Sequence, residues 1–212
     1  MEILNKEVKA YINELYRDDE QGIIAQMREQ YEEAYPIIPL ETARFLSTML
    51  TIKKPKKILE VGACIGFSSI LMALKTDAHI TTIDRYEVMI KQAKANFKKY
   101  GLEERITLLE GSALEIMQDL EEEFDFIFID ASKGQYIHFL PEALRLLGQD
   151  GIIISDNILQ HGDIAKSFEE IEKRQRTIYV NMRKFLQEIT HREGLDSSIL
   201  PIGDGVAITA RK

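Results

Sequence analysis

Acidic residues directly follow two apolar segments in the second half of the chain. Asp130 follows Phe124–Ile129, and Asp156-Asn157 follow Ile152–Ser155. If the two segments are neighbouring parallel strands about 5 Å apart, their carboxyl ends open onto one crevice and the polar side chains converge there. Oxygen ligands without Cys or His suit Mg²⁺ or Mn²⁺. The alternative is that each Asp only caps a loop, and we favour the metal site.

A lysine lies three residues after the first of these acids, in Asp130-Ala131-Ser132-Lys133. A lysine beside a bound cation gives up its proton more readily because like charges repel, so Lys133 is a candidate general base. A metal also acidifies a coordinated hydroxyl, and the resulting oxyanion is a nucleophile for an electrophilic methyl group. A lone lysine after a strand is more often solvated, so this assignment depends on its acidic neighbours.

A glycine-containing loop with an acidic partner lies earlier in the chain. Gly62 and Gly66 stand where a strand turns into a helix, so the backbone can pass close to a ligand. Asp84 follows the next strand, where a carboxylate can bind a ribose hydroxyl, and residues 111–113 follow the third strand, where an adenine edge would lie. The spacing is not the Gly-x-Gly-x-x-Gly of pyrophosphate sites, which favours S-adenosylmethionine. A plain tight turn is the alternative.

Alternating apolar and amphipathic segments must position these residues. Strands are predicted at Ile58–Val61, His79–Ile83, Arg105–Leu109, Phe124–Ile129 and Ile152–Ser155, with helices at Gly66–Lys75, Glu87–Tyr100, Leu114–Leu120 and Ile137–Leu147. This alternation is typical of an α/β fold with a parallel sheet covered on both faces. A long helix is predicted from Ile164 to Thr190. Asp204-Gly205, between the apolar segments Ser198–Ile202 and Val206–Ala210, predicts a final antiparallel pair.

The first 52 residues are predicted to be entirely helical. Three segments, Lys6–Tyr16, Gln21–Ala34 and Leu40–Leu50, carry the helical pattern. We therefore expect one domain over residues 1–212, with residues 1–52 as a helical N-terminal cap within it.

These residues together resemble a known family. Glu60-x-Gly62-x-x-x-Gly66-x-Ser68, Asp84, Asp130-x-x-Lys133-x-x-Tyr136 and Asp156-Asn157 are similar to the divalent-metal-dependent class I methyltransferases of the catechol and caffeoyl-CoA O-methyltransferase family, from about Ile37 to Lys212. The resemblance implies a Rossmann-like, seven-stranded, mostly parallel sheet, S-adenosylmethionine as methyl donor, and a homodimer.

The resemblance also implies roles for individual residues. Mg²⁺ would be held by Asp130, Asp156 and Asn157, with Lys133 as the base and Asp130 also next to the cofactor. The remaining cofactor residues would lie on its methionine and ribose parts (Glu60, Gly62, Gly66, Ser68, Asp84), near adenine (Gly111, Ser112, Ala113) and over the cofactor (Ile38).

Two further segments narrow the expected acceptor. Arg174–Tyr179 and Ile199–Gly205 resemble bacterial tRNA 5-hydroxyuridine methyltransferases, which methylate the hydroxyl of a wobble uridine to give 5-methoxyuridine. Ser132 stands where small-molecule members often carry a bulky or acidic residue. We therefore expect tRNA as substrate, with a free catechol or caffeoyl-CoA-type phenylpropanoid as the alternative.

Local charge agrees with a tRNA substrate. The segment from Lys173 to Arg192 has six basic residues and one acid, Glu188. On one helix Lys173, Arg176 and Arg183 would lie near one face and suit phosphate contacts, with Arg174 beside them. A solvated helix face is the alternative interpretation.

Composition sets the outer limits. With 27 basic and 35 acidic residues the net charge is −8, so no global positive field attracts nucleic acid. Cys64 is the only cysteine, which excludes an intrachain disulfide and favours a reducing compartment. No apolar segment follows Met1 and no apolar run spans a bilayer, so we expect a cytoplasmic protein without a membrane partner. A nicotinamide-dependent oxidoreductase and a non-catalytic binding protein are the disfavoured alternatives.

Overall fold

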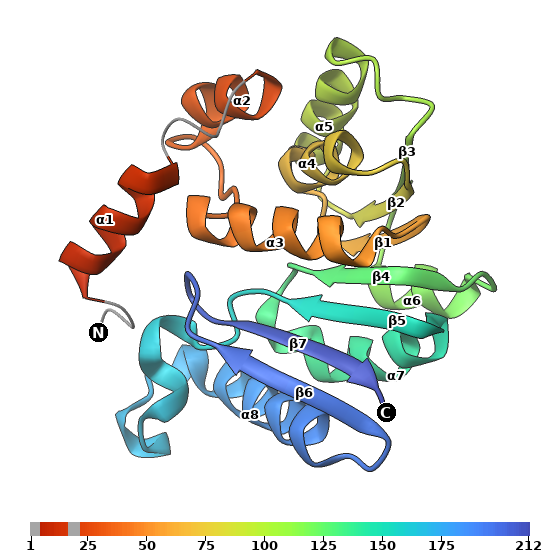
Figure 1. Cartoon of the computed structure of the whole chain (residues 1–212). Helices are drawn as coiled ribbons and strands as arrows, with labels where there is room; N and C mark the ends of the chain where they lie inside the picture. Colours follow the sequence, from red (N-terminus) through yellow and green to blue (C-terminus); the bar gives the residue numbers. More distant parts are fainter. Residues whose placement is uncertain (1–4, 17–21) are drawn as a thin grey trace.

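The fold is a seven-stranded sheet with helices on both faces (Figure 1), seen in a computed structural model that describes residues 5–16 and 22–212. The strand order is β3-β2-β1-β4-β5-β7-β6. The strands are β1 (Lys57–Val61), β2 (His79–Asp84), β3 (Ile106–Glu110), β4 (Phe124–Ile129), β5 (Leu147–Ser155), β6 (Leu195–Leu200) and β7 (Val206–Arg211).

Strand direction separates the sheet into two parts. The pairs β1–β2, β1–β4, β2–β3 and β4–β5 are parallel, whereas β7 is antiparallel to both β5 and β6. The predicted parallel sheet with an antiparallel C-terminal pair is therefore confirmed. β5 begins at Leu147, five residues before the predicted strand, and β6 begins at Leu195 and ends at Leu200, earlier than predicted.

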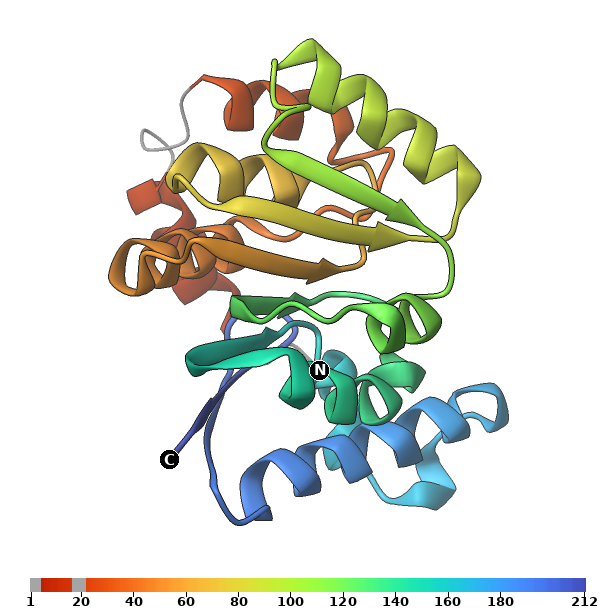
Figure 2. The ribbon, with the colours of Figure 1, turned by 90° about the vertical axis from the view of Figure 1, so that its right-hand side faces the viewer.

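Helices cover each face of the sheet, and Figure 2 shows the two layers from the side. Residues of α2, α3, α4 and α5 join one apolar cluster, and residues of α6, α7 and α8 join the other. The helices are α1 (Lys6–Tyr16), α2 (Ile23–Tyr31), α3 (Leu40–Lys53), α4 (Phe67–Lys75), α5 (Glu87–Lys99), α6 (Ala113–Asp119), α7 (Tyr136–Leu146) and α8 (Arg176–His191).

Both apolar clusters draw on the same central strands. In β1, Ile58 belongs to one cluster and Leu59 to the other, and in β4 Phe128 and Ile127 divide in the same way. Successive residues of a strand point to opposite faces, so a strand buried on both faces must be apolar throughout. This is why the short apolar runs of the sequence predict the central strands.

The N-terminal helices are tied to the domain by polar contacts. Lys9 of α1 forms an ion pair of 2.8 Å with Glu41 of α3, and the Tyr31 hydroxyl of α2 donates to Asn96 of α5 at 3.0 Å. The Asn96 amide in turn donates to the carbonyl of Ile65 at 2.8 Å, in the loop after β1. Three helices occupy this region as predicted, but α2 is shorter than the predicted Gln21–Ala34, of which Gln21 lies outside the described residues.

The predicted helix from Ile164 to Thr190 is wrong in its first half. Short 3₁₀ segments occupy Gln160–Ala165, Phe168–Glu170 and Lys173–Gln175, and α8 begins only at Arg176. The backbone N–H and hydroxyl of Ser167 both donate to the Glu170 carboxylate, at 2.9 and 2.7 Å. Such a capping box starts a new helical turn and competes with a continuous helix.

Within residues 5–16 and 22–212, the structure contains no helix with the length and apolar character needed to cross a membrane.

Candidate active site

A pocket of about 350 Å³ opens at the carboxyl ends of the central strands. This edge is where parallel α/β sheets bind ligands. Six of the predicted cofactor residues are among those that line the pocket: Gly62, Asp84, Gly111, Ser112, Ala113 and Asp130. Ile38, Glu60, Gly66 and Ser68 are not among its lining residues.

The four predicted residues outside the lining are buried near the pocket or in the core. Ile38 is 3% exposed and belongs to the apolar cluster of the α2–α5 side. Gly66 precedes α4 and its Cα faces the Phe97 ring of α5, which leaves no space for a side chain. Ser68 is buried in the first turn of α4.

Gly62 is required where β1 passes β4. Its φ of +108° is disfavoured for other residues, and an added Cβ would lie 2.1 Å from the backbone oxygen of Asp130. The N–H groups of Gly62 and Ala63 donate to the Ile83 carbonyl at 3.0 and 3.1 Å. The glycine therefore allows the ends of β1, β2 and β4 to meet beneath the pocket.

Glu60 is a fully buried carboxylate under the glycine loop. Its Oε2 accepts hydrogen bonds from the hydroxyls of Ser69 and Thr82, while Oε1 is buried without a hydrogen-bond partner among the described residues. Burial raises the pKa of Glu60 to about 7, against the opposing effect of hydroxyls that include Ser68. An unpartnered buried oxygen at this place is suited to a cationic or hydrogen-bond-donating ligand group.

Asp84 organises the loops around the pocket. Its Oδ2 accepts from the N–H of Cys64 at 2.8 Å, and its Oδ1 accepts from the N–H groups of Arg85 and Tyr86 at 2.7 and 2.9 Å. Each carboxylate oxygen has further lone pairs, so these bonds do not prevent binding of a ribose hydroxyl. They fix the side chain at the position that the sequence predicts for ribose.

The predicted metal ligands come together at the ends of β4 and β5. Ile129 is paired with Ser155, so Asp130 and Asp156 follow directly paired residues, as expected from the sequence. Asp156 is fully buried; its Oδ1 accepts the Asn157 N–H at 2.8 Å, and its Oδ2 has no partner among the described residues.

The like charges of Asp130 and Asp156 repel each other. Burial raises the pKa of Asp130 to about 6, an effect that Lys133 reduces. Burial and the charge of Asp130 raise the pKa of Asp156 well above its ordinary value. In the described part of the chain no group of three or more His, Cys, Asp or Glu is arranged to hold a metal. The buried carboxylate of Asp156 with its unpaired oxygen, the half-buried carboxylate of Asp130 and the adjacent Asn157 nevertheless offer oxygen donors of the kind that suit a hard divalent cation.

Lys133 lies in a 3₁₀ turn (Lys133–Gln135) after β4, with its side chain 30% exposed. Its Nζ is 3.0 Å from Oδ2 of Asp204, in the loop between β6 and β7. In the sequence Asp204 predicts only a turn between two strands. The sequence offers little sign that Asp204 contacts Lys133. The two residues are 71 positions apart and meet only because β7 pairs with β5.

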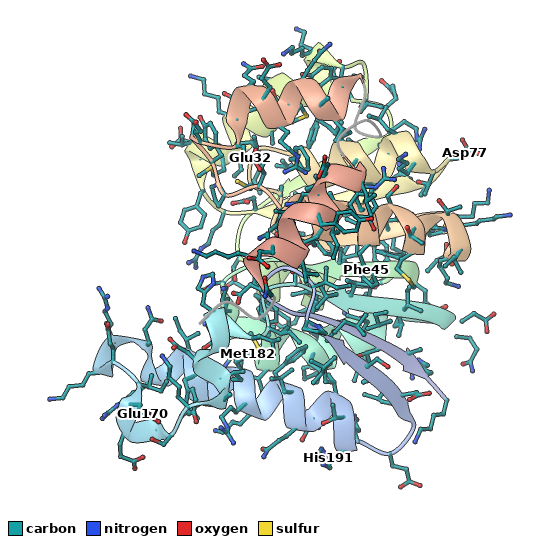
Figure 3. All side chains as sticks on the ribbon, turned by 60° about the vertical axis from the view of Figure 1, so that its left-hand side comes forward. Glu32, Phe45, Asp77, Glu170, Met182 and His191 are labelled. Atoms are coloured by element: carbon teal, nitrogen blue, oxygen red, sulfur yellow. The ribbon has the colours of Figure 1, made fainter. Side chains whose placement is uncertain are left out.

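A second cavity of about 530 Å³ adjoins Lys133. Its lining is polar and comes mostly from the 3₁₀ segments: Lys133, Gln160, His161, Asp163, Lys166, Glu170, Glu172, Arg174, Gln175 and Ile178. No aromatic residue is among these described lining residues. Gln160 has a buried Nε2 without a partner in the described chain. Figure 3 labels Glu170 in this segment and Met182 of α8, which belongs to the apolar cluster between α8 and the sheet.

The basic residues proposed for tRNA lie in α8 and in the 3₁₀ turn before it, and several are held by contacts within the chain. Lys173 and Arg174 precede α8, and Arg174 is paired with Glu172 at 2.8 Å. Arg176 donates to the Ile171 carbonyl and packs over the Phe168 ring; Arg183 donates to the Ile164 carbonyl and to the Tyr179 hydroxyl. Lys173–Gln175 is a 3₁₀ turn that continues directly into α8, so a basic face for tRNA stays a prediction.

The strand order and the antiparallel C-terminal pair are those of a class I methyltransferase fold, and comparisons with known proteins agree. The O-methyltransferase family model matches residues 9–212. Caffeoyl-CoA O-methyltransferase of Populus kitakamiensis is 31% identical over 182 residues, covering 82% of this chain and 77% of its own.

Solved structures extend this similarity to nearly the whole chain. One from Staphylococcus aureus has a TM-score of 0.90 and 31% identity, covering 98% of this chain and 100% of its own. The methyltransferase PaMTH1 of Podospora anserina, solved with S-adenosylhomocysteine bound, has a TM-score of 0.86 and 27% identity, covering 99% and 97%. The chain belongs to the O-methyltransferase family.

Gly62→Ala tests the close approach of β1 and β4. We expect the free energy of unfolding to fall by about 3 kcal/mol or more, because the methyl group overlaps a backbone carbonyl. Gly101→Ala is the matched control: its φ is +67°, but within the described chain no atom lies within 4 Å of the added Cβ. Chemical denaturation measures both, and equal losses would contradict the steric argument.

Glu60→Gln tests the buried carboxylate. Because the folded-state pKa of about 7 exceeds the ordinary 4.5, the folded protein retains a proton that the unfolded chain releases. The stabilisation that this proton gives the folded state is fully present below about pH 4.5. As the pH rises through about 7 it is lost, and the free energy of unfolding falls by up to about 3 kcal/mol.

The measurement is the free energy of unfolding of wild type and variants from pH 5 to 8. The fall in the free energy of unfolding with rising pH should disappear in Glu60→Gln. It should persist in Glu103→Gln, because Glu103 is exposed. A pH profile that Glu60→Gln leaves unchanged would show that Glu60 titrates normally.

Proposed function

We propose that the protein transfers the methyl group of S-adenosylmethionine to an acceptor hydroxyl, with a divalent metal held by Asp130, Asp156 and Asn157. The observation that carries the proposal is the buried, unpartnered Oδ2 of Asp156, which follows β5 where Asp130 follows the neighbouring strand β4. S-adenosylhomocysteine in the Podospora relative supports the same cofactor for this chain.

The larger part of the cofactor fits the pocket beside the glycine loop. Asp84 would bind the ribose and residues 111–113 would lie against the adenine, because all four line this pocket. The sulfonium and amino groups of S-adenosylmethionine are cationic, so this acidic edge of the sheet favours them. The pyrophosphate of a dinucleotide would meet the same acidic groups and be repelled.

The chain's own residues account for the proton and the acceptor. When bound, a divalent metal would polarise the acceptor oxygens as a Lewis acid. Lys133 lines the second cavity and, as the neutral amine, would take the proton of the acceptor hydroxyl. The hydroxyl oxygen then bonds to the methyl carbon while the carbon–sulfur bond breaks and its electron pair stays on sulfur, leaving S-adenosylhomocysteine.

The comparisons favour a small aromatic acceptor. The Populus relative is a caffeoyl-CoA O-methyltransferase, and a relative from Vitis vinifera is a flavonoid 3',5'-methyltransferase. We therefore infer that the acceptor is an aromatic ring with a hydroxyl next to a second oxygen, as in catechols and caffeoyl groups, so that both oxygens can approach one metal.

A modified uridine of tRNA is the second candidate. The polar cavity beside Lys133 favours it, because its described lining has hydrogen-bonding groups where a phenyl ring would need an apolar wall. The 5-hydroxyl and the adjacent carbonyl of 5-hydroxyuridine offer the same two-oxygen arrangement as a catechol.

One assay separates these acceptors. Methyl transfer from radiolabelled S-adenosylmethionine is measured with caffeoyl-CoA, with a simple catechol and with tRNA that contains unmethylated 5-hydroxyuridine, each with Mg²⁺ or with EDTA. Mg²⁺-dependent label in the first two supports the small-molecule function, and label confined to tRNA supports the second candidate. Absence of transfer to all three would contradict both.

Asp130→Asn tests the metal site. The substitution keeps the size of the side chain and removes one negative charge, so we expect Mg²⁺-dependent methyl transfer to be lost while S-adenosylhomocysteine still binds. Asp196→Asn, on the exposed side of β6, is the control for loss of an aspartate charge. Calorimetric titration with Mg²⁺ checks binding directly, and unchanged Mg²⁺ affinity would refute the assignment of Asp130.

Lys173→Glu tests the tRNA candidate. Lys173 is exposed near the polar cavity, whereas reversing Arg176 would also break its internal contacts. If tRNA binds here, the affinity for tRNA should fall. The plot of log K against the logarithm of the salt concentration should become less steep, its slope smaller in magnitude by about 1 or more.

Lys75→Glu, at the C-terminal end of α4, makes the same charge change at a distant place. Salt-dependent tRNA binding measures all three proteins. Equal binding by Lys173→Glu and Lys75→Glu would exclude this segment as the tRNA surface.

A further inference from the structure

One buried carboxylate joins the catalytic lysine to the wall of the second cavity. Asp204 is 7% exposed and lies in the loop between β6 and β7. Its Oδ2 is 3.0 Å from Nζ of Lys133, and its Oδ1 accepts the backbone N–H of His161. The His161 ring also lies beside it, with Nδ1 3.5 Å from Oδ1.

The loop that carries Asp204 is held by backbone hydrogen bonds. The N–H groups of Ile158 and Leu159 donate to the carbonyls of Gly205 and Asp204, at 3.1 and 2.9 Å. The loop therefore lies against the segment that follows Asp156-Asn157. Figure 1 shows it at the same side of the sheet as the arrowhead of β5. Asp204 is thus fixed in place before any ligand binds.

Lys133, in contrast, needs a partner to fix it. Its side chain is 30% exposed and has a flexible four-carbon chain, and it starts from a three-residue 3₁₀ turn. An ammonium held by a fixed carboxylate occupies fewer positions than a free one, and correct placement of a proton-transfer group contributes strongly to rate.

We propose that Asp204 is a positioning residue for the methyl-transfer reaction: it holds Nζ of Lys133 at the second cavity and links it to His161 of the cavity lining. The inference rests on the proposed function, in which Lys133 takes the acceptor proton as the neutral amine; its N–H can donate to Asp204 while its lone pair receives the proton. It adds a residue from the antiparallel end of the sheet to a site otherwise built from the parallel strands.

Asp204→Asn removes the ion pair with Lys133 and keeps the hydrogen bond from the His161 N–H. The amide oxygen can still accept the N–H of His161, while the amide nitrogen faces the Lys133 ammonium, donor to donor. We expect kcat to fall by about 100-fold, with KM for S-adenosylmethionine unchanged, because the reacting groups are misplaced and the cofactor pocket is intact. Asp196→Asn, in the same hairpin, should leave both constants unchanged.

A second measurement does not depend on the acceptor. An amine-reactive reagent and mass spectrometry give the labelling rate of Lys133 relative to Lys173 in each protein. Loss of the carboxylate should raise this rate severalfold in Asp204→Asn and not in Asp196→Asn, because the ammonium is released.

The outcomes are distinguishable. Faster Lys133 labelling together with reduced kcat supports the proposal. Unchanged labelling, or a change in KM for S-adenosylmethionine with kcat preserved, would overturn it. If wild type methylates no tested acceptor, the proposed function fails, whereas the labelling comparison still decides whether Asp204 holds Lys133.

Discussion

Three carboxylates crowded at one edge of a parallel sheet impose the main constraint on this structure. Glu60, Asp130 and Asp156 stand at or near the ends of β1, β4 and β5, and burial raises the pKa of each. Lys133 lowers the pKa of both aspartates, but one ammonium does not balance three acids. An O-methyltransferase that binds a cationic cofactor and a divalent metal would supply the missing positive charge at this edge. Ligand binding and relief of repulsion are then the same event.

The rest of the fold keeps this edge in place. Apolar strands covered on both faces bring the carboxyl ends together, and Gly62 lets β1 pass the end of β4. On one face the N-terminal cap reaches the glycine loop through Tyr31 and Asn96. At the same edge the β6–β7 loop, whose Gly203 lies beside Thr42 of α3, reaches Lys133. The site is thus held by elements that are far apart in the sequence.

Local patterns predicted most of the sheet and the residues at its edge, because a buried parallel strand must be apolar and its ligand-binding residues follow it directly. Asp84, Asp130 and Asp156 are found that way. Asp204 was missed as a site residue because its contact depends on how β7 pairs with β5, which no local pattern encodes. The helix before Arg176 was over-extended because the Ser167–Glu170 capping box outweighs helical periodicity. The metal, the homodimer and the acceptor stay predictions.

The 3₁₀ segments before α8 bear on how the sequence of such an enzyme can change in evolution. The 3₁₀ segments Phe168–Glu170 and Lys173–Gln175 bury none of their residues, yet this part of the chain forms much of the second cavity's wall. Substitutions there leave the central strands and the cofactor side untouched. If the second cavity binds the acceptor, as proposed, acceptor preference can drift independently of the methyl-donor pocket, and relatives with the same sheet can differ in what they methylate.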